Sequence, residues 1–227
     1  MTIEQAFNNT TAYYDDWMKK ALPNFNDLFN SAVDIVPFMA EEPIKVLDLG
    51  AGSGLFTWFI QQKYKQAGFV LIDLADKLLE TAKTRFAGSS QSFEYILGDY
   101  RDLRSLPAFD LVISSLSIHH LTHAEKQDLF KQVYQKLKPG GAFINIDQVH
   151  GETEGLRKLY WDHWLNQVNS SGASREQIED SIQRRTTYDK DALLADQLLW
   201  LKQAGFSDVD CVYKNFFVGV FLGKKTG

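Results

Sequence analysis

The feature that most limits the fold of this chain is a regular alternation of short apolar runs with amphipathic stretches. The apolar runs that we interpret as strands are Ile44–Leu49, Phe69–Asp73, Phe93–Leu97, Phe109–Ser114 and Ala142–Val149. Between them, apolar residues recur at helical spacing over Gly54–Tyr64, Lys77–Phe86 and Ala124–Leu137. Strands that are apolar along their whole length are typical of a sheet covered on both faces. We therefore predict an α/β fold with a parallel, doubly wound sheet.

The two ends of the chain and one internal segment depart from this alternation. A helix is predicted over Asp189–Ala204, followed by two closely spaced strands, Val209–Lys214 and Phe216–Leu222, which favour an antiparallel hairpin at the edge of the sheet. Residues 1–43 are predicted to form one or two helices ahead of the first strand, and residues 151–188 interrupt the alternation. We expect both segments near the carboxyl ends of the strands, where open α/β sheets bind ligands.

Composition and charge exclude several classes of protein for this chain. The chain has 24 Lys and Arg against 29 Asp and Glu, a formal net charge of -5, so it lacks an overall basic field for nucleic acid. Its single cysteine, Cys211, excludes a disulfide framework and a cysteine-rich zinc site. The apolar runs are far shorter than the roughly 20 residues of a membrane helix. The polar N-terminus with an early Glu is unlike a signal peptide. These features favour a cytoplasmic enzyme or binding domain.

A glycine loop follows the first strand. Gly50, Gly52 and Gly54 allow a sharp turn and a close approach of backbone amides to a ligand, and the start of the next helix adds partial positive charge. The spacing differs from the G-x-G-x-x-G dinucleotide fingerprint, and no Lys follows Gly54 as a phosphate loop requires. Asp48 in the strand would repel a pyrophosphate and attract an ammonium group. The loop therefore suits a zwitterionic or cationic ligand, and a ligand-free tight connection is the alternative.

The stretch Val-Leu-Asp-Leu-Gly-Ala-Gly-Ser-Gly at 46–54 resembles motif I of the class I S-adenosylmethionine (SAM)-dependent methyltransferases. Asp73 matches the acidic residue with which that family binds both ribose hydroxyls, and Gly98-Asp99-Tyr100 resembles its adenine motif. Residues 109–121 resemble the fourth-strand motif, and Lys138-Pro139-Gly140-Gly141 resembles the turn before the fifth strand. The motifs occur in order over residues 44–149.

This resemblance implies a Rossmann-like, seven-stranded sheet of order 3-2-1-4-5-7-6 with the last strand antiparallel. It also implies SAM as the cofactor, with S-adenosylhomocysteine as the product. A single methyltransferase domain is then expected over 1–227. It consists of an N-terminal helical cap (1–43), a SAM-binding core (44–150), a helical lid insert (151–188) and a C-terminal helix with a β-hairpin (189–227). The implied cofactor-binding residues are Tyr14, Gly50, Ala51, Gly52, Ser53, Gly54, Asp73, Leu74, Leu78, Asp99, Tyr100, Ser115 and Leu116.

Within the family, the chain is most similar to small stand-alone bacterial and archaeal methyltransferases with Ile-His-His-Leu after the fourth strand. It also looks like the tRNA wobble-uridine carboxymethyl/carboxy-SAM synthase and ubiquinone-biosynthesis methyltransferase groups. Tyr14-Asp15 resembles the N-terminal cap of such chains. Related chains often carry Arg four residues after that Tyr, where this chain has Met18. Lys19 is the alternative clamp on the SAM carboxylate, as a point charge.

Candidate catalytic residues follow the fourth strand and end the fifth. A dyad of His120 with Asp147 would provide a base for an acceptor that must lose a proton, with His119 as a further candidate. The alternative is that these histidines have structural hydrogen bonds. Together with His150 they offer donors that suit zinc, iron or nickel. Because the sequence has no H-E-x-x-H motif and similar family members need no metal, we expect none.

The insert is the predicted substrate lid. Leu156, Leu159, Tyr160 and Trp164 share a helical face that either packs on the sheet or lines an acceptor pocket. The pair Arg184-Arg185 either binds an acidic group of the substrate or stays solvated.

The function predicted from these features is methyl transfer from SAM to a small-molecule acceptor, with no membrane partner and with a homodimer left open. The alternatives are a tRNA-modifying methyltransferase, a carboxy-SAM-type enzyme, a non-catalytic SAM-binding module and an NAD-binding oxidoreductase.

Overall fold

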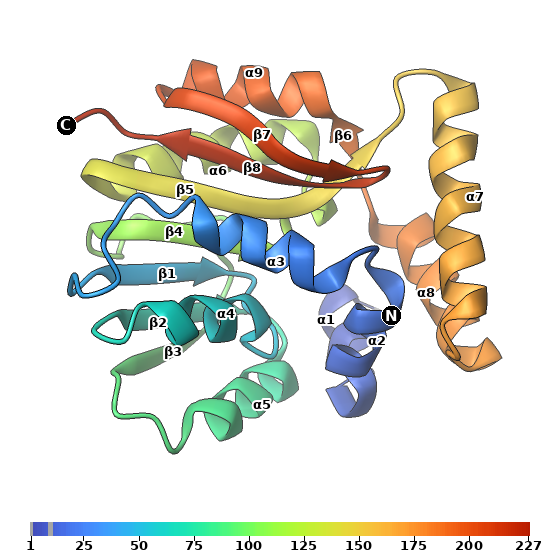
Figure 1. The fold of residues 1–227 in the computed structure, drawn as a ribbon, viewed down its shortest axis with the longest axis horizontal. Helices are drawn as coiled ribbons and strands as arrows, with labels where there is room; N and C mark the ends of the chain where they lie inside the picture. The colour runs from blue at the N-terminus through green and yellow to red at the C-terminus, as the bar shows by residue number, and fades with distance from the viewer. Residues whose placement is uncertain (1, 9–10) are drawn as a thin grey trace.

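The structure, a computed structural model, describes residues 2–8 and 11–227. Its sheet has the order β3-β2-β1-β4-β5-β8-β7 (Figure 1). The strands are β1 (Lys45–Leu49), β2 (Gly68–Asp73), β3 (Phe93–Leu97), β4 (Phe109–Ser115), β5 (Leu137–His150), β7 (Ser207–Asn215) and β8 (Val218–Lys224), and β6 (Ala192–Leu193) pairs with β5 alone. Strands β1 to β5 are parallel, while β8 is antiparallel to both of its neighbours. Apart from the short β6, this is the predicted order, with the hairpin strands β7 and β8 taking the places of predicted strands six and seven.

Helices cover both faces of the sheet, as the continuously apolar strands predict. On one face lie α3 (Phe25–Asp34), α4 (Leu55–Lys63) and α5 (Asp76–Phe86), whose apolar residues share one cluster with Val46 and Leu111. The other face carries α6 (His123–Lys136) and α9 (Leu194–Ala204), which pack with Leu47 and Val112. Neighbouring residues of a strand therefore enter opposite clusters, because successive side chains point to opposite faces.

The remaining helices gather at one end of the sheet. They are α1 (Ile3–Asn8), α2 (Tyr14–Ala21), α7 (Glu154–Ser170) and α8 (Arg175–Tyr188), with a 3₁₀ turn at Thr11–Tyr13. Figure 1 shows them beyond the end to which the β1 arrow points, the carboxyl end of the parallel strands. Gln167 of α7 donates to the Lys20 carbonyl of α2 (3.1 Å), which ties the insert to the N-terminal segment.

The structure corrects two sequence-based boundaries. The predicted turn Lys138-Pro139-Gly140-Gly141 lies inside β5, as an irregularity between the pairs Phe109–Leu137 and Leu111–Ala142. The helix predicted from Asp189 begins only at Leu194. Residues 189–193 are extended because the Lys190 amide donates to the His119 carbonyl (2.8 Å) and Ala192 pairs with β5. These tertiary contacts override the local helical pattern.

No helix in the described part of the chain is both long and apolar enough to cross a membrane.

Candidate functional site

A cavity of about 440 Å³, which we call the sheet-end cavity, opens where the loops after β1, β2, β3 and β4 meet. The strand order runs in one direction from β1 to β3 and in the other from β4 onward, and in doubly wound sheets such a reversal leaves a crevice at the carboxyl ends of the two central strands. Helix α1 contributes to its wall from outside the core. The predicted cofactor-binding residues that line it are Tyr14, Gly50, Gly52, Asp73, Leu74, Leu78, Asp99, Tyr100 and Leu116.

All three glycines of the loop have positive φ, and at Gly50 and Gly52 an added side chain would meet different surroundings. At Gly50 (φ +65°), an added Cβ would lie 1.9 Å from the Ser117 hydroxyl oxygen, so a side chain there collides with the loop after β4. At Gly52 (φ +54°), the nearest atoms to an added Cβ are Leu78 Cδ1 at 3.7 Å and Tyr14 Cε1 at 3.9 Å. A side chain at Gly52 would therefore fill space in the cavity, where the backbone would otherwise approach a ligand.

Asp73 organises the wall opposite this loop. Its two carboxylate oxygens accept hydrogen bonds from the amides of Gly52 and Ala75, both at 2.7 Å. Burial raises the pKa of Asp73, and these backbone donors oppose the rise. Because each oxygen has two lone pairs, one acceptor position remains on each. The carboxylate can therefore accept two further bonds from a pair of neighbouring hydroxyl groups.

The far end of the cavity is built by Asp99 and Tyr100. The Tyr100 hydroxyl donates to the Ser117 carbonyl (3.1 Å) and accepts from the Ser117 hydroxyl (2.9 Å), which joins the loops after β3 and β4. Asp99 accepts from Arg101 Nε (2.8 Å). Burial tends to raise the pKa of Asp99, but Arg101 outweighs it and lowers the pKa. Sequence reasoning missed Ser117, although it directly follows Ser115 and Leu116.

Four residues predicted to bind the cofactor do not line the sheet-end cavity: Ala51, Ser53, Gly54 and Ser115. The Ser53 hydroxyl donates to Asp15 (2.6 Å), and Asp15 also pairs with Arg85 of α5. Asp15 therefore fastens α2 to the glycine loop. Direct contact of Ala51, Ser53, Gly54 and Ser115 with a cofactor stays a prediction.

A smaller cavity of about 80 Å³, the side cavity, adjoins the first. Both cavities are lined by Phe7, Tyr14, Leu116 and His120. The other residues that line the side cavity come from α2 and the residue after it, the turn after β4, the end of β5, helices α7 and α8, the segment after α8 and the hairpin turn. They are Trp17, Met18, Ala21, Leu22, His119, Gln148, Trp164, Ser181, Arg184, Arg185, Asp189 and Phe217. The predicted lid and the predicted cap thus meet at one small space.

The predicted lid face is divided in the structure. Trp164 is buried and lines the side cavity, whereas Leu156 and Leu159 are 38% and 50% exposed. Tyr160 and Trp161 line a separate cavity of about 350 Å³ beside the end of β5. The helical stripe therefore does not form a single acceptor wall, because α7 stands beside the sheet and only part of its circumference faces inward.

The basic residues of the side cavity are Arg184 and Arg185. The Arg185 guanidinium lies over the Trp164 ring at 4.6 Å and is 3.8 Å from Asp189. Among the described residues, no carboxylate pairs with Arg184. Burial raises the pKa of the Tyr14 hydroxyl, and the charge of Arg184 opposes this rise. Lys19, the sequence-based clamp candidate, lines a different surface cavity beside Lys20 and Phe25. Of the two arginines that line the side cavity, Arg184 is the one without a carboxylate partner among the described residues.

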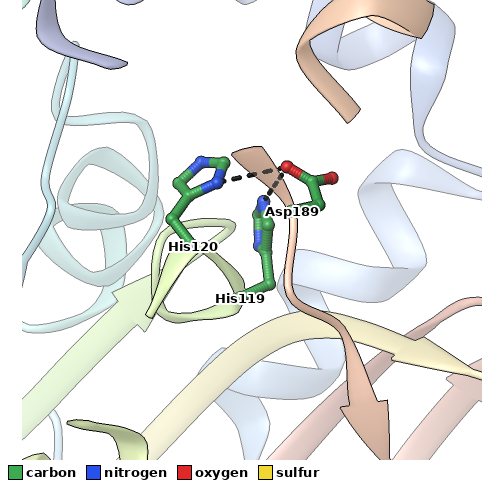
Figure 2. Close-up of side chains that lie close together, drawn as sticks. All are labelled: His119, His120 and Asp189. Atoms are coloured by element: carbon green, nitrogen blue, oxygen red, sulfur yellow. Dashed lines mark ion pairs between the residues drawn. The ribbon is translucent and has the colours of Figure 1, made fainter. Parts of the chain in front are cut away.

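The predicted pairing of His120 with Asp147 is wrong. Asp147, which is fully buried, accepts from His119 Nδ1 (2.6 Å), while His120 Nδ1 lies 3.1 Å from Asp189 Oδ1. The reason is the 3₁₀ turn Ile118–His120, which directs the two histidines differently. Both approach Asp189 (Figure 2), but among the described residues only His119 has a hydrogen bond with Asp147. Sequence reasoning missed Asp189, since it placed that residue in a helix.

The environment shifts the pKa values of the two histidines in opposite directions. Burial lowers the pKa of His119, but the carboxylates of Asp189 and Asp147 outweigh it and raise that pKa to about 9. Burial and the neighbouring His119 lower the pKa of His120 to about 4. For Asp189, burial tends to raise the pKa, and the two histidines lower it to about 2. His120, the only one of the two that reaches the sheet-end cavity, is therefore a neutral imidazole near pH 7.

Comparison with known proteins supports one class. Residues 46–141 match the family described as Methyltransferase domain. The strand order, the glycine loop and Asp73 at the sheet-end cavity agree with this match, and together they support a class I SAM-dependent methyltransferase with SAM as the cofactor.

Among individual proteins, the chain is similar to the carboxy-S-adenosyl-L-methionine synthase of Nautilia profundicola, with 20% identity over 93% of this chain and 92% of that protein. It is similar in structure to human N-acetylserotonin methyltransferase in complex with SAM (TM-score 0.66, 19% identity, 99% of this chain), of which it spans 57%. A Haloferax volcanii methyltransferase, solved in complex with the Trm112 methyltransferase activator, matches with a TM-score of 0.71 and 15% identity over 100% of this chain and 98% of that one.

Proposed function

We propose that this methyltransferase acts on a small acceptor carrying an anionic group, which binds in the side cavity. The observation that carries the proposal is Arg184, a cation without a carboxylate partner among the described residues, in a cavity that adjoins the sheet-end cavity through His120 and Tyr14. Because the side cavity, at about 80 Å³, is much smaller than the sheet-end cavity of about 440 Å³, we propose that it holds only the anionic end of the acceptor.

The sheet-end cavity fits SAM. In our proposal, Asp73 accepts the ribose hydroxyls at its two remaining acceptor positions, and Asp99 with Tyr100 holds the adenine end. The loop glycines let the backbone approach the amino-acid part, and Leu74 and Leu78 supply apolar walls. When bound, SAM supplies a sulfonium methyl group for an in-line displacement. The chain itself has to position the acceptor and exclude water.

His120 is the catalytic residue of this proposal, because it lines both cavities and so lies between cofactor and acceptor. His119 and Asp147 act through it as positioning residues. Their 2.6 Å hydrogen bond fixes the loop after β4 against β5, and Lys126 Nζ donates to the Leu121 carbonyl (2.8 Å) from the other side. These contacts hold the His120 ring at the junction of the cavities.

A carboxy-SAM-type reaction is the second candidate. It is favoured by the similarity to carboxy-SAM synthases over more than nine tenths of both chains, together with an Arg at the cavity beside the cofactor. A tRNA acceptor is less well supported, because the two basic pairs of the sequence do not converge. Lys19 and Lys20 line one surface cavity, while Arg184 and Arg185 line the side cavity. With a small-molecule acceptor, we also propose a cytoplasmic location and a lid role for α7 and α8.

The test is turnover of SAM with a panel of small carboxylic acids and their neutral amides, followed by mass spectrometry of the products. We expect a methylated acid, and Arg184→Gln should raise the acceptor KM about tenfold to 100-fold, since a hydrogen bond to a charged group contributes about 1.5–3 kcal/mol. SAM affinity should not change.

Arg175→Gln is the matched control, because Arg175 lies on the same helix in an exposed pair with Glu179. Methylation of amides as readily as acids, or an unchanged KM in Arg184→Gln, would contradict the anionic acceptor. A carboxylated SAM product would select the second candidate.

A further inference from the structure

We propose that His119, His120 and Asp189 form a binding site for one divalent cation of borderline hardness, zinc(II) or iron(II). The three residues each offer one ligand atom, and these atoms lie within 4.8 Å of one another (Figure 2). They come from the turn after β4 and from the extended segment after α8. Two imidazoles and one carboxylate are donors that both ions accept.

The distances between the donor atoms match a common metal ligand sphere. Asp189 Oδ1 lies 3.5 Å from His119 Nε2 and 3.1 Å from His120 Nδ1. Ligands bound tetrahedrally at about 2.0–2.1 Å are separated by about 3.3–3.4 Å. The third separation, between the two ring nitrogens, is no more than 4.8 Å.

The angles support the same interpretation. Both ring nitrogens of His120 are buried, and within the described residues neither has a hydrogen-bond partner of good geometry, despite the 3.1 Å distance from Nδ1 to Asp189 Oδ1. Directional hydrogen bonds need the donor to point at the acceptor. Metal ligands instead point at a shared centre, so their donor atoms lie close together without pointing at one another. His120 and Asp189 have this relation.

Outer contacts hold two of the three ligands. Asp147 accepts from His119 Nδ1 (2.6 Å), so His119 Nε2 is the ring nitrogen that would ligate the ion. In the ion-free structure this nitrogen lies 3.0 Å from Gln148 Nε2, a contact that the ion would replace. Gln148 Nε2 donates to Asp189 Oδ2 (3.0 Å), and Arg185 Nε lies 3.8 Å from the same oxygen, so Oδ1 remains for the ion. A carboxylate behind a ligating histidine is the usual support of such sites.

The charges around the site leave room for a cation. Three carboxylates lie together with little exposure: Asp147 (0%), Asp189 (7%) and Asp191 (18%). Among the described residues, the buried cations beside them are Lys126 and Arg185, and Lys190 lies at the more exposed edge, so with neutral histidines the three buried carboxylates outnumber the buried cations by one. Buried charge without a partner is costly. A divalent ion or a proton on His119 would each compensate it.

The ion would border the side cavity, which all three ligands line. Catalytic sites of this kind keep one coordination position open. That position would take an oxygen of the acceptor, so that His120 would act on the acceptor through the ion. This use rests on the proposed function, whereas binding of the ion does not.

Metal binding is measured on the full chain after chelator treatment, without SAM or acceptor. We expect one equivalent of Zn²⁺ by calorimetry, and one equivalent of Co²⁺ with the visible absorption of a four- or five-coordinate N,O site. His120→Ala and Asp189→Asn should each weaken binding at least 100-fold. Asp147→Asn should retain one equivalent with about tenfold to 100-fold lower affinity.

His163→Ala is the matched control, because His163 stacks on Phe216 and lines another cavity. Circular dichroism shows whether each variant folds. If His120→Ala fails to fold, Asp189→Asn still tests the site, because Asn has nearly the same shape as Asp. Two results would overturn the proposal. One is that neither Zn²⁺ nor Co²⁺ binds stoichiometrically, and the other is that binding survives in folded Asp189→Asn and His120→Ala. The first result would leave a proton on His119 as the compensating charge. Failure of the anionic-acceptor test would not affect this measurement.

Discussion

Replacing Asp73 tests the assignment of the sheet-end cavity most directly. In Asp73→Ala, the amides of Gly52 and Ala75 lose their acceptor, and the cavity loses both acceptor positions for a diol. At about 1.5 kcal/mol for each of two hydrogen bonds to a charged group, the loss is about 3 kcal/mol. SAM affinity should therefore fall about 100-fold.

The assay is isothermal calorimetry with SAM and with S-adenosylhomocysteine, together with urea unfolding to show that the variant is folded. Asp73→Asn keeps one accepting oxygen but turns an NH₂ group toward one of the two amides, so its affinity should fall between those of wild type and Asp73→Ala. Glu80→Ala, an exposed residue on α5, is the control and should bind normally. Unchanged affinity in folded Asp73→Ala would refute the reasoning.

Three further changes test other parts of the site. Gly50→Ala should destabilise the fold by at least about 1 kcal/mol in urea unfolding, because the residue is left-handed and its Cβ would collide with Ser117. Burial raises the pKa of Asp48 to about 7, so its ionisation opposes folding as pH rises from about 4 to 7. Asp48→Asn should therefore gain about 2–3 kcal/mol relative to wild type between pH 5 and pH 8, and a pH-independent difference would contradict this. Asp15→Asn should increase amide exchange in α2 and weaken SAM binding, because the bond from Ser53 to Asp15 ties the cap to the glycine loop.

Much of the fold follows from local pattern. Apart from β5, which begins at Leu137 and not at Ala142, the parallel strands, helices α4, α5 and α6 and the closing hairpin begin and end within a few residues of their predicted limits. Local prediction failed where tertiary contacts compete with it. The segment from Asp189 has the composition of a helix start, yet its backbone pairs with the His119 carbonyl and with β5.

The candidate site also has a part that the sequence predicts and a part that it does not. Nine of the predicted cofactor-binding residues line the sheet-end cavity. Apart from Tyr14 of α2, they follow strands whose carboxyl ends meet at one edge. Which histidine meets Asp147 was not predictable, because adjacent residues differ by a rotation that depends on the turn they occupy. The spacing of Ile-His-His-Leu is compatible with either partner.

By itself, the sequence determined the alternation of strands and helices, the glycine loop and the acidic residues after β2 and β3. These depend on periodicity and on backbone conformations set within a few residues. Only the tertiary structure decided that Asp189 meets His119 and His120, that Arg184 faces the side cavity, and that Lys19 does not. The bond between His119 and Asp147 spans 28 positions of sequence. Convergence over such distances depends on how whole elements pack and rotate, and no local pattern encodes it.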